Sequence, residues 1–348
     1  MISSELIFSS AFIIFILGVL LLDLGVFTRS NHIISFKESM GWTFAWIILS
    51  IIFYFFLLHF GELLHGIKDY DTLNAILEKH KTKIIIPDDN FDAAIQIYRK
   101  NLSLEFITGY VIEKALSVDN IFVMIMIFMA FGVEAEYYKK VLFWGIIGAL
   151  VMRFAFIFMF SALIHQFDWI LYVFGILLVL TGVKMFITRN NEEKIDPKHH
   201  PIVQFSGKLF NVHPEFIKDR FWIRKSGKLF ITPLFITLIV IEFSDIIFAV
   251  DSVPAIFAIT HDPFIVFFSN IFAILGLRAL FFAIYNVMGL FRFLKIGLSV
   301  LLTFIGVKML AHTYLESIGF KTIHSLYVIV GILAVSIIAS LLLPEKKQ

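Results

Sequence analysis

The chain has 348 residues, of which 59% are hydrophobic and only 16% are charged. Soluble globular proteins carry roughly 25% charged residues, so this composition excludes an ordinary soluble domain and indicates an integral membrane protein. The net charge of +2 argues against a nucleic-acid partner, and the absence of cysteine excludes disulfides and thiolate metal sites.

Long apolar segments follow one another along the chain. A transmembrane helix needs about 20 predominantly apolar residues, and these segments are rich in Phe, Ile and Leu without the alternation of barrel strands. We therefore predict an all-α, polytopic transmembrane helical bundle of about nine spans in a lipid bilayer. The predicted spans are 6–27, 40–60, 102–131, 141–164, 169–187, 229–259, 264–286, 293–312 and 323–343.

The N-terminal segment MISSELIFSS has no basic residue, and the apolar run that it begins is too long for the core of a signal peptide. We expect this run to be retained as the first span. The short connections and the C-terminal tail on one side of the predicted bundle carry seven Lys or Arg residues, and the short connections on the other side carry one. The positive-inside rule then predicts that the N-terminus lies outside and the C-terminus lies in the cytoplasm, and we expect the membrane to be the bacterial inner membrane.

The sequence repeats itself in a fixed order. ALSVDN at Ala115–Asn120 is matched by IFAVDS at Ile247–Ser252, and the intramembrane Arg153 is matched by Arg278. The motif GVKM then occurs twice, at Gly182–Met185 and Gly306–Met309. Each copy contains three spans, and an odd number of spans reverses the chain, so we predict two inverted three-helix repeats with a binding site near the membrane midplane.

The repeat divides the chain into five predicted parts. Two N-terminal spans and an outer loop come first, followed by the first repeat, a basic cytoplasmic loop, the second repeat, and a last helix with a cytoplasmic tail. Their bounds are 1–101, 102–187, 188–228, 229–312 and 313–348.

Five carboxylates lie inside two of the predicted spans. On the translocon scale each central charge costs about 2.5–3.5 kcal/mol, so protons, fixed cations or a bound metal must offset the cost. The repeat equates Glu113 with Asp245 and Asp119 with Asp251, so the acids form a two-fold set. The five are Glu113, Asp119, Glu242, Asp245 and Asp251.

Neutral oxygen ligands accompany these acids, namely Ser117, Asn120, Ser244 and Ser252. A site made entirely of oxygen ligands suits Mg²⁺, Ca²⁺ or Mn²⁺ rather than Zn²⁺ or Cu²⁺. Buried carboxylates also bind protons readily, so exchange of metal for protons is a possible coupling. The sequence thus favours a pathway for a divalent cation or for protons.

The alternative is that the acids serve only as structural ion-pair partners. Five basic residues inside predicted spans are available for such pairing, and the bases other than Lys114 lie on helices different from those of the acids. They are Lys114, Arg153, Lys184, Arg278 and Lys308. This distribution favours an acidic pocket within a basic frame, with Lys114 pointing away from it.

Other polar positions have open interpretations. Pro254 predicts a break or kink beyond Asp251, whose freed carbonyls would join a cation site. Asp23 is either a charge at a helix end or a gate ligand. His59, Glu62 and His65 recur every three residues and form either a metal-capture site or a solvated helix end, and Glu105 is similar. His199, His200 and His213 are expected to be solvated.

Three segments resemble the signature motifs of the TerC/Alx family of integral membrane proteins, which is grouped with the LysE-like exporters. They are LLDLGVFTR, EFITGYVIEKALSVDN at Glu105–Asn120, and EFSDIIFAVDSVP at Glu242–Pro254. The resemblance implies manganese export, a response to pH, and an association with tellurium resistance. It places the metal ligands at Glu113, Asp119, Asn120, Glu242, Asp245 and Asp251.

We therefore expect a manganese exporter that carries Mn²⁺ as its transported ion and has no permanently bound cofactor. No nucleotide-binding loop or nucleophile–base pair occurs in the sequence, so we do not expect an enzyme. Two alternatives remain. The first is a membrane hub that delivers metal to secreted proteins, or a tellurium-resistance accessory, without strong flux of its own. The second is an exporter of small solutes such as amino acids, with Arg153 or Arg278 as the partner of the substrate carboxylate.

Overall fold

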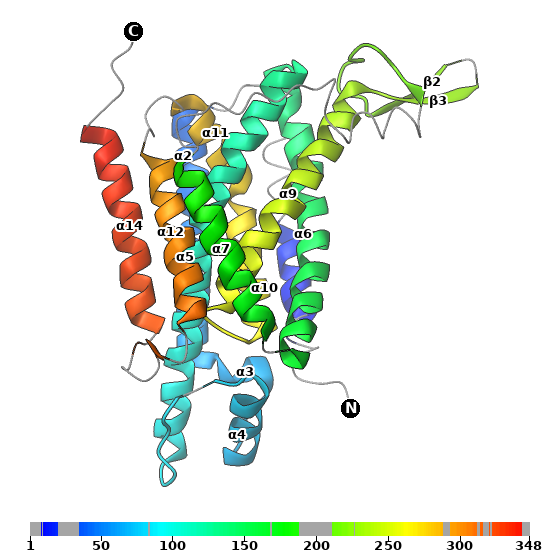
Figure 1. Cartoon of the computed structure of the whole chain (residues 1–348). Helices are drawn as coiled ribbons and strands as arrows, with labels where there is room; N and C mark the ends of the chain where they lie inside the picture. The colour runs from blue at the N-terminus through cyan, green and yellow to red at the C-terminus, as the bar shows by residue number, and fades with distance from the viewer. Residues whose placement is uncertain are drawn as a thin grey trace.

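The computed structural model describes residues 8, 10–19, 35–82, 84–167, 169–187, 211–225, 227–287, 293–311, 314–315, 320 and 322–342. These residues form a bundle of long helices (Figure 1). The predicted all-α transmembrane bundle is confirmed as a helical membrane fold. The helices are Ser10–Val19, α2 (Phe36–Phe60), α3 (Glu62–His65), α4 (Tyr70–Lys79), α5 (Phe91–Phe131), α6 (Ala135–Gln166), α7 (Trp169–Ile187), α9 (Pro233–Phe257), α10 (Pro263–Leu275), α11 (Leu277–Val287), α12 (Leu294–Leu310) and α14 (Thr322–Leu342).

Each of the nine predicted apolar segments contains helix, because a long apolar run in a bilayer must satisfy its backbone hydrogen bonds internally. The helices α5 and α6 extend beyond the predicted bounds 102–131 and 141–164. By length and composition, four described helices are able to cross a membrane, and a fifth span results if the bent pair α10–α11 is counted as one. The number of nine spans therefore stays a prediction.

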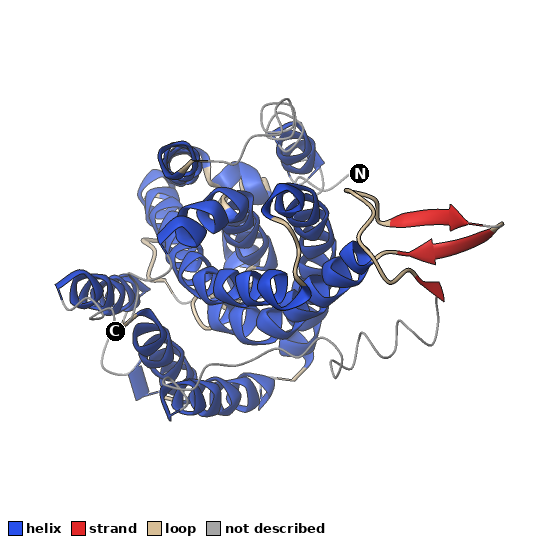
Figure 2. Ribbon diagram, turned by 90° about the horizontal axis from the view of Figure 1, so that it is seen from above, coloured by secondary structure: helices blue, strands red, loops and turns tan. Residues whose placement is uncertain are grey.

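The helices at the centre pair reciprocally. The two long helices α5 and α9 lie against each other and run in opposite directions (Figure 1). Helix α6 packs on α9 as α10 packs on α5, and α7 lies along α12. Figure 2 shows the helical bundle from above, with the strands projecting at one side. An inverted repeat predicts this exchange of partners.

Glycine allows α7 and α12 to approach closely. A Cβ atom on Gly182 would lie 2.7 Å from the backbone oxygen of Ser299, and one on Gly306 would lie 2.6 Å from the backbone oxygen of Gly175. Small residues at such contacts are the usual means by which membrane helices pack. The two glycines begin the two copies of GVKM, so the repeated motif has the same packing role in both places.

The predicted break beyond Asp251 is wrong. Helix α9 continues through Pro254 and ends at Phe257, so the proline removes one backbone donor within the last turn and does not interrupt the helix. The break occurs instead at Gly276, where α10 and α11 meet at 43°. The ammonium group of Lys114 donates a hydrogen bond to the Ala273 carbonyl beside this break, at 3.2 Å, so Lys114 faces a neighbouring helix.

The strands that the structure describes form one small sheet. It contains β1 (Asn211–Val212), β2 (Trp222–Lys225) and β3 (Lys228–Ile231) in the order β1-β3-β2. β2 and β3 are antiparallel, and β1 is parallel to β3. The β2–β3 hairpin leads directly into α9 and lies at the end of the bundle opposite α3 and α4 (Figure 1).

Candidate functional site

A buried arginine joins two of the predicted acids at the centre of the bundle. Arg153 of α6 donates from Nε to Oδ2 of Asp245 at 3.1 Å and from Nη2 to Oδ1 at 2.9 Å. Its Nη1 donates to Oε1 of Glu113. The relative exposures are 2% for Arg153, 3% for Asp245 and 0% for Glu113, so the three helices α5, α6 and α9 meet at a charged cluster without solvent.

The helical period explains why these side chains meet. Glu113, Ser117 and Asn120 follow one another on one face of α5, at spacings of four and three residues, and all three are buried. Asp245 and Ser252 are seven residues apart on α9 and are also buried. Each of the two opposed helices therefore presents a polar stripe to the interior.

The cluster carries more hydrogen-bonding capacity than the described residues use. Asn270 of α10 accepts a hydrogen bond from Nη1 of Arg153 through Oδ1, at 3.1 Å. Within the described part of the chain, Oε2 of Glu113, Nδ2 of Asn270 and Oγ of Ser252 are buried and have no hydrogen-bond partner. Buried polar groups are normally satisfied by protein, water or ions, so we expect water, an ion or another polar ligand to contact these atoms.

The described charged groups around Arg153 include more acids than bases. Two carboxylates face one guanidinium, and the bidentate geometry with Asp245 is the strong arrangement of an arginine–carboxylate pair. Ion pairing therefore accounts for part of the acidic set, as the structural alternative expects. It leaves one oxygen of Glu113 without a hydrogen bond from the described residues.

Glu242 lies one turn before Asp245 on α9 and is half-buried. Its carboxylate occupies the space beside Gly148 of α6, where an added Cβ atom would come within 2.4 Å of both carboxylate oxygens. Only glycine, which has no Cβ atom, leaves space for this carboxylate. Gly148 of α6 therefore allows Glu242 of α9 to lie between the two helices.

The structure brings together some of the predicted residues and leaves others open. Glu113 and Asp245 meet, Asn120 lies on the buried stripe of Glu113, and Glu242 lies one turn from Asp245. The backbones of Asp119 and Asp251 lie in α5 and α9, but their side chains are outside the described part of the structure. Asp23, His199 and His200 are outside the described residues altogether.

Sequence reasoning missed Asn270. The available signal was an amide within the apolar stretch of the predicted span 264–286, where it follows a serine. The sequence indicates Arg153 as a base available for pairing or as a partner of a substrate carboxylate. Its contacts with both Glu113 of α5 and Asp245 of α9 depend on how the helices pack in space, which the local sequence does not state.

The three-residue series His59, Glu62 and His65 does not form one site. The ring of His59 is exposed and hydrogen-bonded to the Phe55 carbonyl at 2.8 Å. Glu62 is paired with Arg99 through two contacts of 2.5 and 2.6 Å. His65 faces away to Asp262, because α2 ends at Phe60 and α3 begins a new helix.

The sequence of this chain is similar to a family of known membrane proteins. Residues 98–348 match the model of the integral membrane protein TerC family. An uncharacterized membrane protein of Myxococcus xanthus, STKORF319, is 40% identical over 96% of this chain and 91% of its own length.

Similarity extends to proteins of other bacteria. A protein of Escherichia coli strain K12, provisionally named membrane-bound redox modulator Alx, is 42% identical over 81% of this chain and 78% of its own. An uncharacterized membrane protein of Rickettsia bellii is 38% identical over 94% of both chains. No solved structure matches. The chain is a multi-pass helical protein that belongs to the TerC family of integral membrane proteins.

Proposed function

We propose that this protein moves a divalent cation across the bacterial inner membrane and that it exports manganese. The pathway lies between two inverted repeats, 102–187 and 229–312, with the N-terminus outside and the C-terminus in the cytoplasm. The ligands along it are Glu113, Asp119, Asn120, Glu242, Asp245 and Asp251. The metal is cargo, and no permanently bound cofactor is required.

The observation that carries this proposal is the meeting of Glu113 and Asp245 in the bundle interior, from helices that run in opposite directions. Ionisable groups inside membrane helices are costly and typically line substrate or proton paths. The buried atoms of Glu113, Asn270 and Ser252 without a hydrogen-bond partner among the described residues support a polar ligand at this depth. Oxygen-rich surroundings favour a hard cation such as Mn²⁺.

Arg153 has a defined role in this mechanism. In the arrangement described, its guanidinium is ion-paired with both Glu113 and Asp245. An incoming divalent cation competes for the same oxygens, and Arg153 takes them back when the cation leaves. Neither carboxylate is then left buried and unpaired, a condition that costs several kcal/mol.

Transport is tested with purified protein in liposomes that contain a manganese-sensitive dye. We expect flux for the wild type and at least a tenfold loss for Asp245→Asn and Glu113→Gln. Asp219→Asn is the matched control, because Asp219 is exposed and lies at the sheet end of the bundle. Full flux in the two variants overturns the site. A folded wild-type protein without flux favours the membrane hub that delivers metal to secreted proteins.

The other candidates fit the geometry less well. Export of an amino acid through Arg153 would require that arginine to bind the substrate carboxylate, yet it is already bound to two carboxylates of the protein. The name of the Escherichia coli relative suggests redox modulation. This chain has no cysteine, so a redox effect without thiols follows most simply from a change in metal supply.

A further inference from the structure

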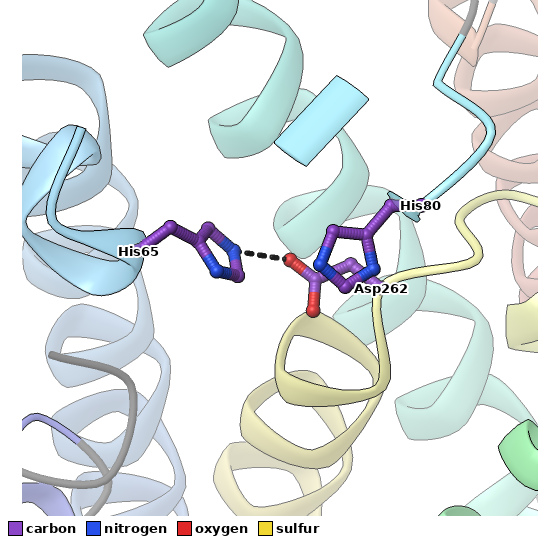
Figure 3. Close-up of side chains that lie close together, drawn as sticks. All are labelled: His65, His80 and Asp262. Carbon is purple, nitrogen blue, oxygen red and sulfur yellow. Dashed lines mark hydrogen bonds and ion pairs between the residues drawn. The ribbon is translucent and has the colours of Figure 1, made fainter. Parts of the chain in front are cut away.

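A second group of potential metal ligands lies outside the Arg153 cluster, at the α3–α4 end of the bundle. Among the described residues, His65, His80 and Asp262 form a group in which one ligand atom from each lies within 4.8 Å of the others. Their relative exposures are 8%, 3% and 3%. Figure 3 shows the carboxylate of Asp262 beside both imidazole rings, with His65 Nε2 at 2.8 Å from Oδ2.

Local backbone features place the two histidines. His65 is the last residue of α3, and Gly66 follows with φ +66°, a left-handed conformation that glycine adopts without strain. His80 is the C-cap of α4, and Lys81 follows with φ +50°. Few residues other than glycine adopt this conformation, and such residues are frequent at functional sites. The C-terminal end of α4 also favours a positive charge beside His80.

The carboxylate of Asp262 is oriented by its neighbours. Its Oδ1 accepts a hydrogen bond from the backbone N–H of Phe264 at 2.9 Å, which leaves Oδ2 directed at His65. The Asp262 N–H donates to Thr260 Oγ1 at 3.2 Å, and that hydroxyl donates to Glu105 at 2.7 Å. Supporting hydrogen bonds of this kind orient metal ligands in known sites.

We propose that His65, His80 and Asp262 bind a divalent transition-metal ion of the zinc class, at a site separate from the manganese pathway. Two imidazoles and one carboxylate are a common ligand set for such ions and leave further positions open for water. Tetrahedral zinc holds its ligand atoms about 3.3 Å apart, so side-chain rotations from separations of at most 4.8 Å close the site. The nitrogen-rich set distinguishes it from the oxygen-rich centre.

The position of the site indicates which helices a bound ion would restrain. His65 and His80 lie in the segment between α2 and α5, whereas Asp262 lies in the connection between α9 and α10. Those two helices carry Asp245 and Asn270 of the central cluster. A bound ion would fasten the α9–α10 connection to the α3–α4 segment and so restrain the movement of α9 and α10.

The experiment is equilibrium dialysis of untagged, full-length protein in detergent against Zn²⁺ and against Mn²⁺, with thermal unfolding measured in parallel. We expect His80→Gln to lose one equivalent of zinc relative to the wild type, or to bind it at least tenfold more weakly. Zinc should raise the unfolding temperature of the wild type and leave that of His80→Gln unchanged. His80→Gln is preferred because His65→Ala also removes the hydrogen bond to Asp262.

His59→Ala and His213→Ala are the matched controls, since both residues are outside the cluster. Both should retain the zinc equivalent and the thermal shift, and X-ray absorption should show imidazole ligands on the bound zinc. Equal zinc stoichiometry and affinity in the wild type and His80→Gln overturns the site. Asp245→Asn should keep this zinc equivalent while losing manganese flux, so the two proposals fail independently.

Discussion

Arg153 holds the Asp245 carboxylate with two nitrogens, at 2.9 and 3.1 Å, in a part of the bundle where both side chains are almost completely buried. The same guanidinium contacts Glu113, so one side chain of α6 connects α5 to α9. A charge network at this depth is stable only as a complete set, because each member left alone would be a buried, unpaired charge.

Arg153→Gln should therefore be strongly destabilising. The substitution leaves two buried carboxylates without their cation, and breaking a buried pair in this way typically costs about 3–5 kcal/mol. The free energy of unfolding in detergent measures the effect. The triple variant Glu113→Gln, Arg153→Gln, Asp245→Asn should recover part of the loss, because no charge remains. An Arg153→Gln protein as stable as the wild type would contradict the charge network.

Gly148→Ala tests the place of Glu242. Its Cβ atom would lie 2.0–2.4 Å from the Glu242 carboxylate, which is a flexible chain end and will move aside. We expect manganese flux to fall while the free energy of unfolding changes by less than about 1 kcal/mol. Gly145→Ala on the same helix is the control, since its Cβ atom would meet Ile241 at an ordinary 3.7 Å. Unchanged flux in both variants would remove Glu242 from the pathway.

Gly306→Ala tests the α7–α12 contact. Its Cβ atom would lie 2.6 Å from the Gly175 carbonyl oxygen and 2.8 Å from the Val179 amide nitrogen, and backbone atoms cannot move aside as a side chain can. Overpacking of this kind costs about 1–3 kcal/mol, which should appear as a lower unfolding midpoint in detergent. Gly331→Ala in α14 meets nothing within 4 Å and should be neutral or slightly stabilising. A loss of stability in both variants would point to a general effect of alanine.

Lys140→Met tests the ion pair near the sheet. Lys140 lies 3.0 Å from Asp219 and over the ring of Phe221, and both charged groups are partly exposed, so the loss of stability should be below about 1 kcal/mol. The hydrogen bond from Lys140 lowers the pKa of Asp219. The contribution is therefore present above the ordinary aspartate pKa of about 4 and disappears as the pH falls through the lower folded value.

The difference in unfolding free energy between the wild type and Lys140→Met should thus be larger at pH 7 than at a pH below the lowered pKa of Asp219. The substitution also removes the contact of the ammonium with the Phe221 ring and its hydrogen bond to the Asp219 carbonyl at every pH, so only the pH-dependent part of the difference reports the ion pair. A difference of the same size at both pH values would show that the ion pair does not contribute.

The sequence anticipated helices better than it anticipated their interruptions. The positions of α2, α5, α6, α7, α9, α12 and α14 follow from apolar runs. Pro254 predicted a break that is absent, because the residue lies only one turn before the helix end. The sequence did not indicate a break at Gly276. In the structure a Cβ atom on Gly276 would lie 2.6 Å from Lys114 Nζ and 3.2 Å from Trp46 Cβ, and the helix bends at this glycine.

The sequence also predicts one candidate site better than the other. Repetition in the sequence selected Glu113 and Asp245, and the structure brings them to one arginine. No local spacing relates His65 and His80 to Asp262, which is 197 residues beyond His65. The regular series His59, Glu62 and His65 suggested a different group, but α2 ends at Phe60 and His65 lies in α3, where it turns to Asp262.

By itself, the sequence determined that this chain is a helical membrane protein, approximately where its helices lie, and that Glu113 and Asp245 are buried among them. Composition and periodicity carry that information because a bilayer admits few ways to satisfy a backbone and penalises every unpaired charge. Only the tertiary structure decided which base faces which acid and which distant histidines share an aspartate. Those relationships depend on how helices cross in space, and crossing is set by side-chain packing over the whole bundle.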